Sequence, residues 1–344
     1  AVGYGAGLSV TTGAQNTFIG GNAGDANTTA NYNTAVGYAS LGSNTTGTSN
    51  VALGAYALDA NTTADYNTAV GSGALGANTT GAANTAVGSE ALDANTTGTR
   101  NVAMGYRALT ENTTGNNNVV LGTEAARTLT GSSNVAIGEE AMEVATSAAE
   151  NVAIGFRSGR YITGSRNTFL GYDSSSQSGN TASDNTGIGY DTLRQNTTGV
   201  NNVAVGSYSL DANTTGYSNT AIGKDSLSAN TTGDRNNAIG VGSMASTTTA
   251  NDNVAMGTSS MGLNTTGVDN VAMGGSALYS NSTGAGNTAL GRATLFSNTT
   301  ASNNTAVGRS ALYANTTGAN NVALGAYALD ANTTANDNTA VGYA

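Results

Sequence analysis

Few side chains of this chain are of the types that perform catalysis. Its 344 residues include no His and no Cys, which removes most nucleophile–base pairs and the usual zinc sites. Glu139 and Glu140 are adjacent carboxylates, but neighbouring side chains of an extended segment point to opposite faces. Residues 20–26 approach a calcium-binding Gly-Gly-x-Gly-x-Asp repeat without its spacing or its repetition. We therefore predict that the chain is not an enzyme and binds no metal or cofactor.

Asn-Thr-Thr and Asn-Ser-Thr triplets recur along the chain, and each is formally an acceptor for N-linked glycosylation. The alternative is a chain corner whose Asn and Thr side chains bond to nearby backbone groups. We favour the corner, because the repeat would generate these triplets whether or not a cell used them. The candidate glycosylation residues are Asn27, Asn44, Asn61, Asn78, Asn95, Asn112, Asn196, Asn213, Asn230, Asn264, Asn281, Asn298, Asn315 and Asn332.

Charged and aromatic residues gather where the sequence is least regular, between residues 118 and 185. Acidic residues come first, at Glu139, Glu140, Glu143 and Glu150, followed by Arg157, Arg160, Tyr161 and Arg166. One interpretation is a reshaped surface that binds a receptor or glycan, anchored by Arg157, Arg160, Tyr161 and Arg166. The other, which we favour, is sequence drift in corners that tolerate change, with the charges solvated.

These residues all belong to one repeat that occurs about twenty times. We number it from the Asn of segments such as "NTAVG", and a Gly follows at position five without exception, from Gly20 to Gly342. The interval between these Asn residues is 17, except for two of 16 and one of 18 between residues 118 and 185. A period so short and strict is typical of a solenoid. The first-position residues are Asn16, Asn33, Asn50, Asn67, Asn84, Asn101, Asn118, Asn134, Asn151, Asn167, Asn185, Asn202, Asn219, Asn236, Asn253, Asn270, Asn287, Asn304, Asn321 and Asn338.

The consensus N-[TV]-A-[VILM]-G-x-x-[AS]-L-x-A-N-T-T-G-x-x predicts the fold. Positions two to four alternate as a strand does, Gly ends the strand, and Asn and Gly suit left-handed corners. We predict an all-β parallel β-solenoid (β-roll), with one 17-residue repeat per coil, about twenty coils and two short strands per coil. Residues 1–344 would form a single repeat domain, which we expect to be a segment of a longer chain because it opens and stops within a repeat.

Each position of the repeat should form a column of like side chains along the solenoid. We expect positions two, four and nine, the last usually Leu, to face the interior, and the first-position Asn residues to form an amide ladder. Position three is Ala in 17 of 21 cases and should then face outward. Such a stripe of small apolar residues suits close packing, and we predict that it contacts other copies of the chain.

Composition narrows the range of partners. A net charge of -10 disfavours nucleic acid and anionic membrane surfaces. No apolar run approaches the roughly eighteen residues of a membrane span, so we expect no membrane insertion in this segment.

The motifs "NTAVG", "NVALG", "NVAIG" and "NVAMG" resemble the head repeats of trimeric autotransporter adhesins of the YadA type. The longer unit "NTAVGYASLGSNTTGTSN" is also similar to repeats of phage tail-fibre and bacterial surface proteins. The resemblance covers the whole chain. It implies a left-handed parallel β-roll, assembly of three chains around an axis and an extracellular location.

We expect a non-catalytic structural shaft of an extracellular fibre, on a cell surface, filament or virion, that associates with itself as a homotrimer or filament. The alternative is an adhesive shaft that binds a cell-surface or glycan receptor, through the irregular segment or through Tyr residues at variable positions. Ice binding is a minor alternative, because adjacent Thr residues point to opposite sides and form no Thr-x-Thr face. The Tyr residues are Tyr38, Tyr56, Tyr106, Tyr190, Tyr208, Tyr279, Tyr313 and Tyr327.

Overall fold

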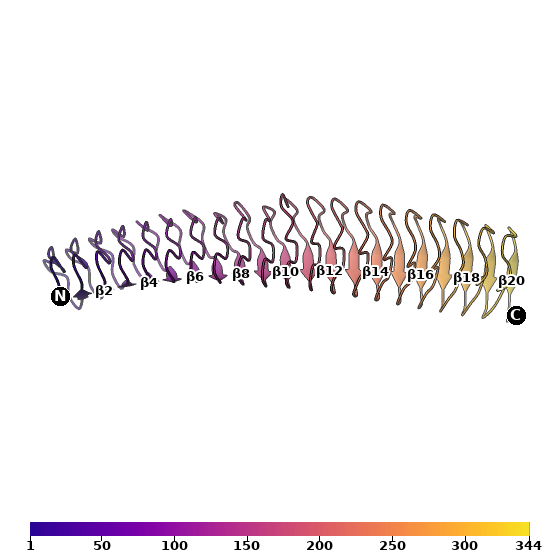
Figure 1. The fold of residues 1–344 in the computed structure, drawn as a ribbon, viewed down its shortest axis with the longest axis horizontal. Coiled ribbons are helices and arrows are strands. Elements are labelled where there is room, and N and C mark those ends of the chain that lie inside the picture. Colours follow the sequence, from indigo (N-terminus) through magenta and orange to yellow (C-terminus); the bar gives the residue numbers. More distant parts are fainter. Residues whose placement is uncertain (344) are drawn as a thin grey trace. The chain divides into compact units, whose positions relative to one another are not determined.

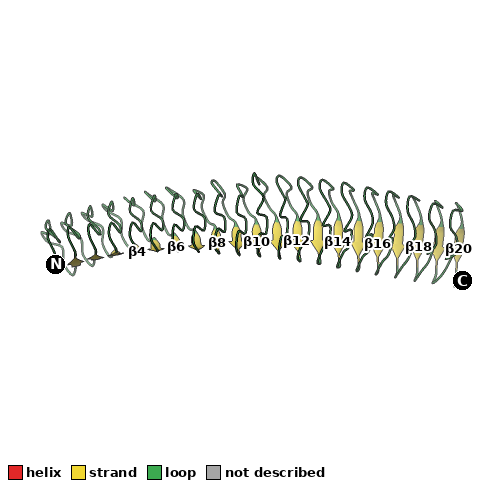
Figure 2. Ribbon diagram, in the orientation of Figure 1, coloured by secondary structure: helices red, strands yellow, loops and turns green. Residues whose placement is uncertain are grey.

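The computed structural model describes residues 1–343 and confirms an all-β parallel solenoid with one repeat per coil. The chain divides into two compact units, Ala1–Asn167 and Thr168–Ala344, which we describe separately. Each coil contributes one three-residue strand at positions two to four of the repeat (Figure 1, Figure 2). Gly at position five then ends the strand, as the consensus predicts.

The first unit contains nine strands and the second contains eleven. Those of the first unit are β1 (Thr17–Ile19), β2 (Thr34–Val36), β3 (Val51–Leu53), β4 (Thr68–Val70), β5 (Thr85–Val87), β6 (Val102–Met104), β7 (Val119–Leu121), β8 (Val135–Ile137) and β9 (Val152–Ile154). Those of the second are β10 (Thr168–Leu170), β11 (Thr186–Ile188), β12 (Val203–Val205), β13 (Thr220–Ile222), β14 (Asn237–Ile239), β15 (Val254–Met256), β16 (Val271–Met273), β17 (Thr288–Leu290), β18 (Thr305–Val307), β19 (Val322–Leu324) and β20 (Thr339–Val341).

Within each unit every strand pairs in parallel with the strand of the next coil, in a register of one repeat. Val36 lies opposite Leu53, and Leu53 lies opposite Val70. In the second unit Val203 lies opposite Thr220 in the same way. Chemically alike side chains therefore form columns, as the repeat predicts. Because the strand amides bond to the coils before and after, each coil depends on its neighbours.

The second half of each coil is a succession of turns, where we had predicted a second strand. Ala39 and Leu41, at positions seven and nine, have φ angles of 53° and 54°, which no extended strand allows. The amides of these turns still bond between coils: Leu41 donates to the carbonyl of Ala57 at 2.9 Å, and Thr45 to that of Thr62 at 2.9 Å. Hydrogen bonding thus continues along the stack without regular strand geometry.

The inward and outward faces of the strand are the reverse of our prediction. The position-three residues, such as Ala35 and Ala52, are fully buried, and so is Leu58 at position nine. Positions two and four point away from the interior, so that Met104 is 41% exposed. The alanine stripe therefore cannot contact another chain. We assigned the larger apolar residues of positions two and four to the interior. The prediction was wrong because the interior has room for little more than a methyl group beside the Leu side chain.

Compensating changes in size show that positions three and nine face each other across the interior. Phe18 replaces the usual Ala at position three, and Gly24 replaces the usual Leu at position nine of the same coil. A Cβ atom added to Gly24 would lie 2.4 Å from Cε1 of Phe18, so the ring occupies the space that Leu fills elsewhere. The three coils with a larger residue at position three all have a smaller one at position nine: Phe18 with Gly24, Val120 with Ala126, and Phe169 with Ser175.

Two columns of buried Asn residues form the other half of the interior. The backbone N–H of Asn50, at position one, donates to Oδ1 of Asn33 in the preceding coil at 2.9 Å, which confirms the predicted ladder. The Asn at position twelve forms a second ladder, in which Nδ2 of Asn61 donates to Oδ1 of Asn44 at 2.8 Å. Nδ2 of Asn50 and Nδ2 of Asn61 both donate to the carbonyl of Ala64, at 2.9 and 3.1 Å. These buried amides are therefore satisfied.

Position five accepts only Gly for a steric reason. Gly37 has a φ angle of 136°, and a Cβ atom added there would lie 2.5 Å from the carbonyl oxygen of Gly54 in the next coil. The neighbouring coils approach so closely at this corner that no side chain fits between them. The invariant glycine thus sets the spacing at the end of each strand.

Candidate interaction surfaces

The outward side chains of the strands form an apolar surface in each unit, which we call the strand surface. It consists of position two, mostly Thr or Val, and position four, which is Val, Ile, Leu or Met in all twenty strands. Neither column contains a charged residue. Position-four side chains such as Ile19, Leu53, Ile222 and Met273 are 36% to 43% exposed. Continuous apolar columns of this kind mark a surface that packs against another surface.

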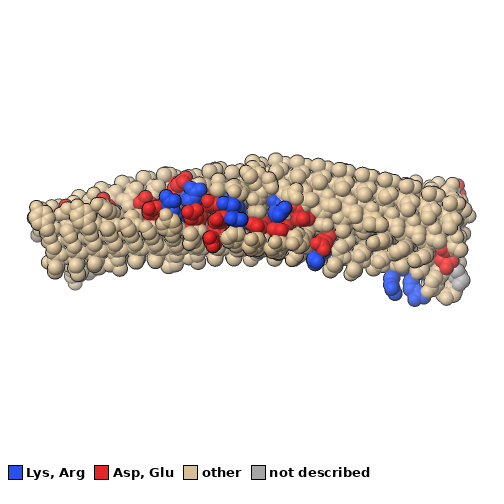
Figure 3. Space-filling view, viewed as in Figure 1, with Lys and Arg blue, Asp and Glu red and all other residues tan. Residues whose placement is uncertain are grey.

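A column of ion pairs runs along the first unit. Nε of Arg107 lies 2.8 Å from Oε2 of Glu90 in the preceding coil. Arg127 contacts Glu111 at 3.2 Å and Glu143 at 3.4 Å, in the coils on either side. Figure 3 shows acidic and basic side chains interleaved in a band on one face. We missed these pairs, although opposite charges spaced by one repeat were the signal that could have revealed them.

The structure brings together three of the four candidate surface-binding residues. Nε of Arg157 donates to Glu140 at 2.7 Å, and Arg160 contacts the same carboxylate at 3.2 Å. Arg160 also lies 2.7 Å from the buried Glu143, and its guanidinium lies 5.0 Å from the ring centroid of Tyr161. Because these cations already neutralise carboxylates of the preceding coil, their geometry supports a structural role for them.

Arg166 lies in a different part of the coil from these three residues. It occupies the last position before the next first-position Asn, and its backbone N–H donates to the carbonyl of Ala149 at 3.1 Å. Its side chain is exposed. The four candidates therefore do not form one patch.

The irregular coils of the first unit also differ inside. The position-twelve ladder ends at Asn112, and the next three coils place Leu129, Ala145 and Ile162 there, all fully buried. Apolar contacts thus replace the amide ladder in this stretch. The loss of the Asn-Thr-Thr corner therefore accompanies a change in the core. Our interpretation of these coils as surface drift did not predict this change.

The asparagines of the glycosylation triplets face inward. Nδ2 of Asn78 donates to Oδ1 of Asn61 at 3.0 Å and to the carbonyl of Gly81 at 2.9 Å, so it has no hydrogen left to donate. A glycan on Nδ2 would break these bonds and has no space in the coil. The structure thus supports the corner interpretation for the folded chain. Asn332 is half-buried, and the fully buried residues are Asn27, Asn44, Asn61, Asn78, Asn95, Asn112, Asn196, Asn213, Asn230, Asn264, Asn281, Asn298 and Asn315.

No protein-family model matches the chain, and no curated protein is significantly similar to it.

Aromatic side chains on the turn side of the coils stack on one another. Tyr38 and Tyr56 of successive coils pack edge to face with ring centroids 5.5 Å apart. Tyr190 packs between Tyr172 and Tyr208, with centroids 5.3 Å away in each case. A second set in the second unit consists of Tyr279, Phe296 and Tyr313. Tyr106 contacts the guanidinium of Arg107 at 5.6 Å, and Tyr327 packs against Tyr343 at 5.8 Å.

Several aspartates near the turns are partly buried. Burial raises the pKa of Asp59, and the nearby Asp25 raises it further. Burial likewise raises the pKa of Asp93, with a contribution from Glu90. These are single carboxylates within columns, and among residues 1–343 no three His, Cys, Asp or Glu side chains come together in a group that could hold a metal ion. The described part of the chain also contains no helix of the length and apolar character that would cross a membrane.

Proposed function

We propose that this chain is a structural shaft of an extracellular fibre, in which copies of the chain associate through the strand surface. The observation that carries the proposal is the pair of outward columns at positions two and four, which are continuous within each unit and contain no charge in any of the twenty strands. A solenoid whose coils bond only to their neighbours extends by adding coils, which suits a spacer. The resemblance to trimeric adhesin heads supports a homotrimer and an extracellular location.

The energetics of the strand surface favour assembly. Burying a Val, Leu, Ile or Met side chain completely contributes about 1.5–3 kcal/mol. A half-exposed side chain has gained only part of this energy when its chain folds, and it gains the rest when another chain covers it. Each added coil places one more such residue on the surface at a spacing of about 4.8 Å. The gain therefore grows with the number of coils, whereas the entropy cost of association is incurred once.

Light scattering on the intact chain tests the proposal. We expect a particle of three times the chain mass of 33.8 kDa. The double substitution Val70→Lys and Val87→Lys places two charges on paired positions of β4 and β5 and should lower the association constant at least about tenfold. The matched control is Thr80→Lys with Thr97→Lys, which adds the same charges to exposed turns of the same coils. A wild-type monomer at micromolar concentration would overturn the proposal.

The stacked aromatic rings support adhesion as a second candidate function. Tyr, Phe and Arg side chains on the turn side remain accessible when the strand surface is covered, because they lie on other positions of the coil. Binding of cells or host surfaces by wild type, and its loss after Tyr→Ser changes at Tyr190 and Tyr208, would support this function. If attachment is unchanged in these variants and in Arg157→Ala, Arg160→Ala and Arg166→Ala, the result would instead support a structural shaft.

A further inference from the structure

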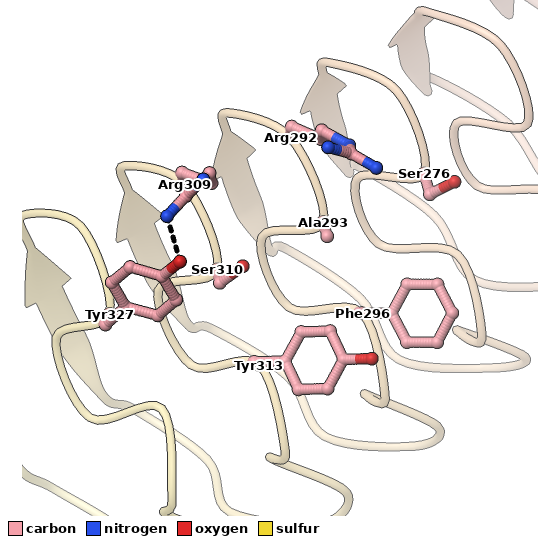
Figure 4. A pocket seen from close by; sticks show the side chains of 8 residues that line it. All are labelled: Ser276, Arg292, Ala293, Phe296, Arg309, Ser310, Tyr313 and Tyr327. Atoms are coloured by element: carbon pink, nitrogen blue, oxygen red, sulfur yellow. Dashed lines mark hydrogen bonds between the residues drawn. The ribbon is translucent and has the colours of Figure 1, made fainter.

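A groove in the second unit crosses several coils between two rows of long side chains. Its floor consists of small residues at position seven, Ser276, Ala293 and Ser310. Arg292 and Arg309, at position six of successive coils, form one side (Figure 4). The small residues matter because other coils carry Tyr, Glu, Arg or Asp at position seven, which would fill this space.

Aromatic rings form the other side of the groove. Phe296 and Tyr313 line it from position ten, and their rings are nearly parallel, with centroids 5.2 Å apart and an interplanar angle of 8° (Figure 4). Tyr279 continues the same stack outside the groove. At one end Tyr327 occupies position seven, and its hydroxyl accepts a hydrogen bond from Nη2 of Arg309. The guanidinium of Arg309 also lies 4.7 Å from the Tyr327 ring centroid, which holds this cation beside the groove.

The two arginines of the groove differ from the other basic residues of the second unit. Among the described residues, no carboxylate lies within ion-pair distance of Arg292 or Arg309. Elsewhere in the unit Arg194 pairs with Asp191 at 3.9 Å, Lys224 with Asp225 at 3.6 Å, and Arg235 with Asp252 at 2.7 Å. In a chain with a net charge of -10, two adjacent cations without acidic partners form a local site for an anion.

We propose that this groove binds an oligosaccharide that carries carboxylate groups. The guanidinium groups of Arg292 and Arg309 each present a planar set of donors that matches a carboxylate. The faces of Phe296 and Tyr313 carry negative potential and attract the polarised C–H groups of a sugar ring. A groove that is open to solvent and crosses successive coils suits a chain of sugars, and sites of this kind combine apolar walls with a few polar groups.

The charge of the protein argues against a densely charged polyanion. Two cations on a surface of net charge -10 favour a ligand with one carboxylate per sugar over nucleic acid, whose binding needs several phosphate contacts. Asp330, which lines a smaller cavity next to Tyr313 and Tyr327, adds a negative charge close by. The proposal does not depend on self-association, because the groove is lined by positions six, seven and ten of the coil, whereas the strand surface consists of positions two and four.

Calorimetric titration of the intact chain with tetragalacturonate provides the first test. Two comparison ligands are the same tetramer with its carboxyl groups methyl-esterified, and the single sugar galacturonate. We expect the tetramer to bind at least about tenfold more tightly than the ester, the equivalent of one charge-assisted hydrogen bond. It should also bind more tightly than the single sugar, which leaves part of the aromatic wall uncovered.

Four variants assign the binding to the groove. Arg292→Gln and Arg309→Gln should each weaken the binding of tetragalacturonate about tenfold. Phe296→Leu should weaken the binding of the tetramer and of its methyl ester to the same extent. The control is Arg100→Gln, which removes an exposed arginine from the first unit and should leave binding unchanged. Circular dichroism and the unfolding midpoint show that each variant remains folded.

Three results would overturn the proposal. The first is equal affinity for the tetramer and its ester, which would exclude recognition of the carboxylate. The second is unchanged binding in Arg292→Gln and Arg309→Gln. The third is binding of a sulfated oligosaccharide or of single-stranded DNA while tetragalacturonate fails to bind, which would assign the groove to another class of anion.

Discussion

At the scale of single residues, the interior depends on buried amides that are satisfied by one another. Between Asn196 and Asn332, the position-twelve ladder of the second unit contains one exception. Thr247 takes the place of Asn, and its Oγ1 atom is buried without a hydrogen-bond partner. Oδ1 of Asn230 in the preceding coil also has no partner, because the Nδ2 donor that an Asn would supply is missing. One substitution therefore leaves two buried polar atoms unsatisfied, which is costly in a low-dielectric interior.

We predict that Thr247→Asn stabilises the chain. The new Nδ2 would donate to Asn230, and the new Oδ1 would accept from Asn264, which restores the ladder of the neighbouring coils. The free energy of unfolding should rise by about 1–3 kcal/mol, measured by denaturant titration. The matched change Asn281→Thr breaks two hydrogen bonds of 2.9 Å, to Asn264 and to Gly284, and should lower the free energy of unfolding by a similar amount. A loss of stability in Thr247→Asn would contradict this account.

A second residue-scale prediction concerns Asp211. Burial raises the pKa of this carboxyl, and its Oδ1 atom has no partner. Because the pKa is higher in the folded chain than in the unfolded chain, the folded chain binds the proton more tightly. The resulting stability is present below the ordinary pKa of 3.8 and is lost as pH rises through the folded pKa. Asp211→Asn should therefore raise the unfolding midpoint at pH 7, and this gain should shrink toward pH 4.

The matched control for this pH dependence is Asp252→Asn. A hydrogen bond from Arg235 lowers the pKa of Asp252, so its contribution is present at neutral pH and is lost as pH falls through the lowered pKa. This substitution should lower the unfolding midpoint at pH 7, opposite in sign to Asp211→Asn. If the unfolding midpoints of the two variants changed with pH in the same way, these opposite contributions of Asp211 and Asp252 to stability would be excluded.

At the scale of one coil, the sequence predicted the period, the columns and the strand at positions two to four. It did not predict which strand face is buried, because hydrophobicity alone favours Val36 over Ala35 for the interior. The structure shows that size decides: Leu58 and the Asn ladders fill a coil of 17 residues, and only a methyl group fits opposite. The occurrence of Phe18 together with Gly24 in one coil could have revealed this size limit. The spacing of Glu90 and Arg107 by one repeat could likewise have revealed the ion pairs.

A double-mutant cycle on Phe18 and Gly24 tests the size rule. Phe18→Ala should destabilise its coil by about 3–5 kcal/mol through the cavity left behind. Gly24→Leu should also destabilise it, by about 1–3 kcal/mol, because the added side chain collides with the ring. The double variant restores the Ala and Leu of the consensus and should recover most of the loss. Hydrogen exchange of the amides in residues 17–33 measures the effect locally, and additive losses would contradict the rule.

At the scale of the whole molecule, two surfaces of different chemistry should respond differently to salt. Copies with a net charge of -10 repel one another, so screening should strengthen association through the uncharged strand surface. The same screening should weaken binding of a carboxylated ligand by Arg292 and Arg309. We therefore predict opposite changes in the two affinities between about 20 and 500 mM NaCl, measured by light scattering and calorimetry. Parallel changes would show that one of the two surfaces is wrongly assigned.

The coils that depart from the consensus have a consequence for how the chain finds its native alignment. Among identical coils, omitting one repeat from the stack would keep most ladders intact at the cost of a single loop. Phe169 makes such a shift less favourable, because its partner in the next strand is Gly187, where an added Cβ would lie 3.1 Å from the ring. An alanine placed there by a skipped repeat would require the Phe169 ring to move. Sequence variation of this kind thus favours one order of stacking among many near-equivalent ones.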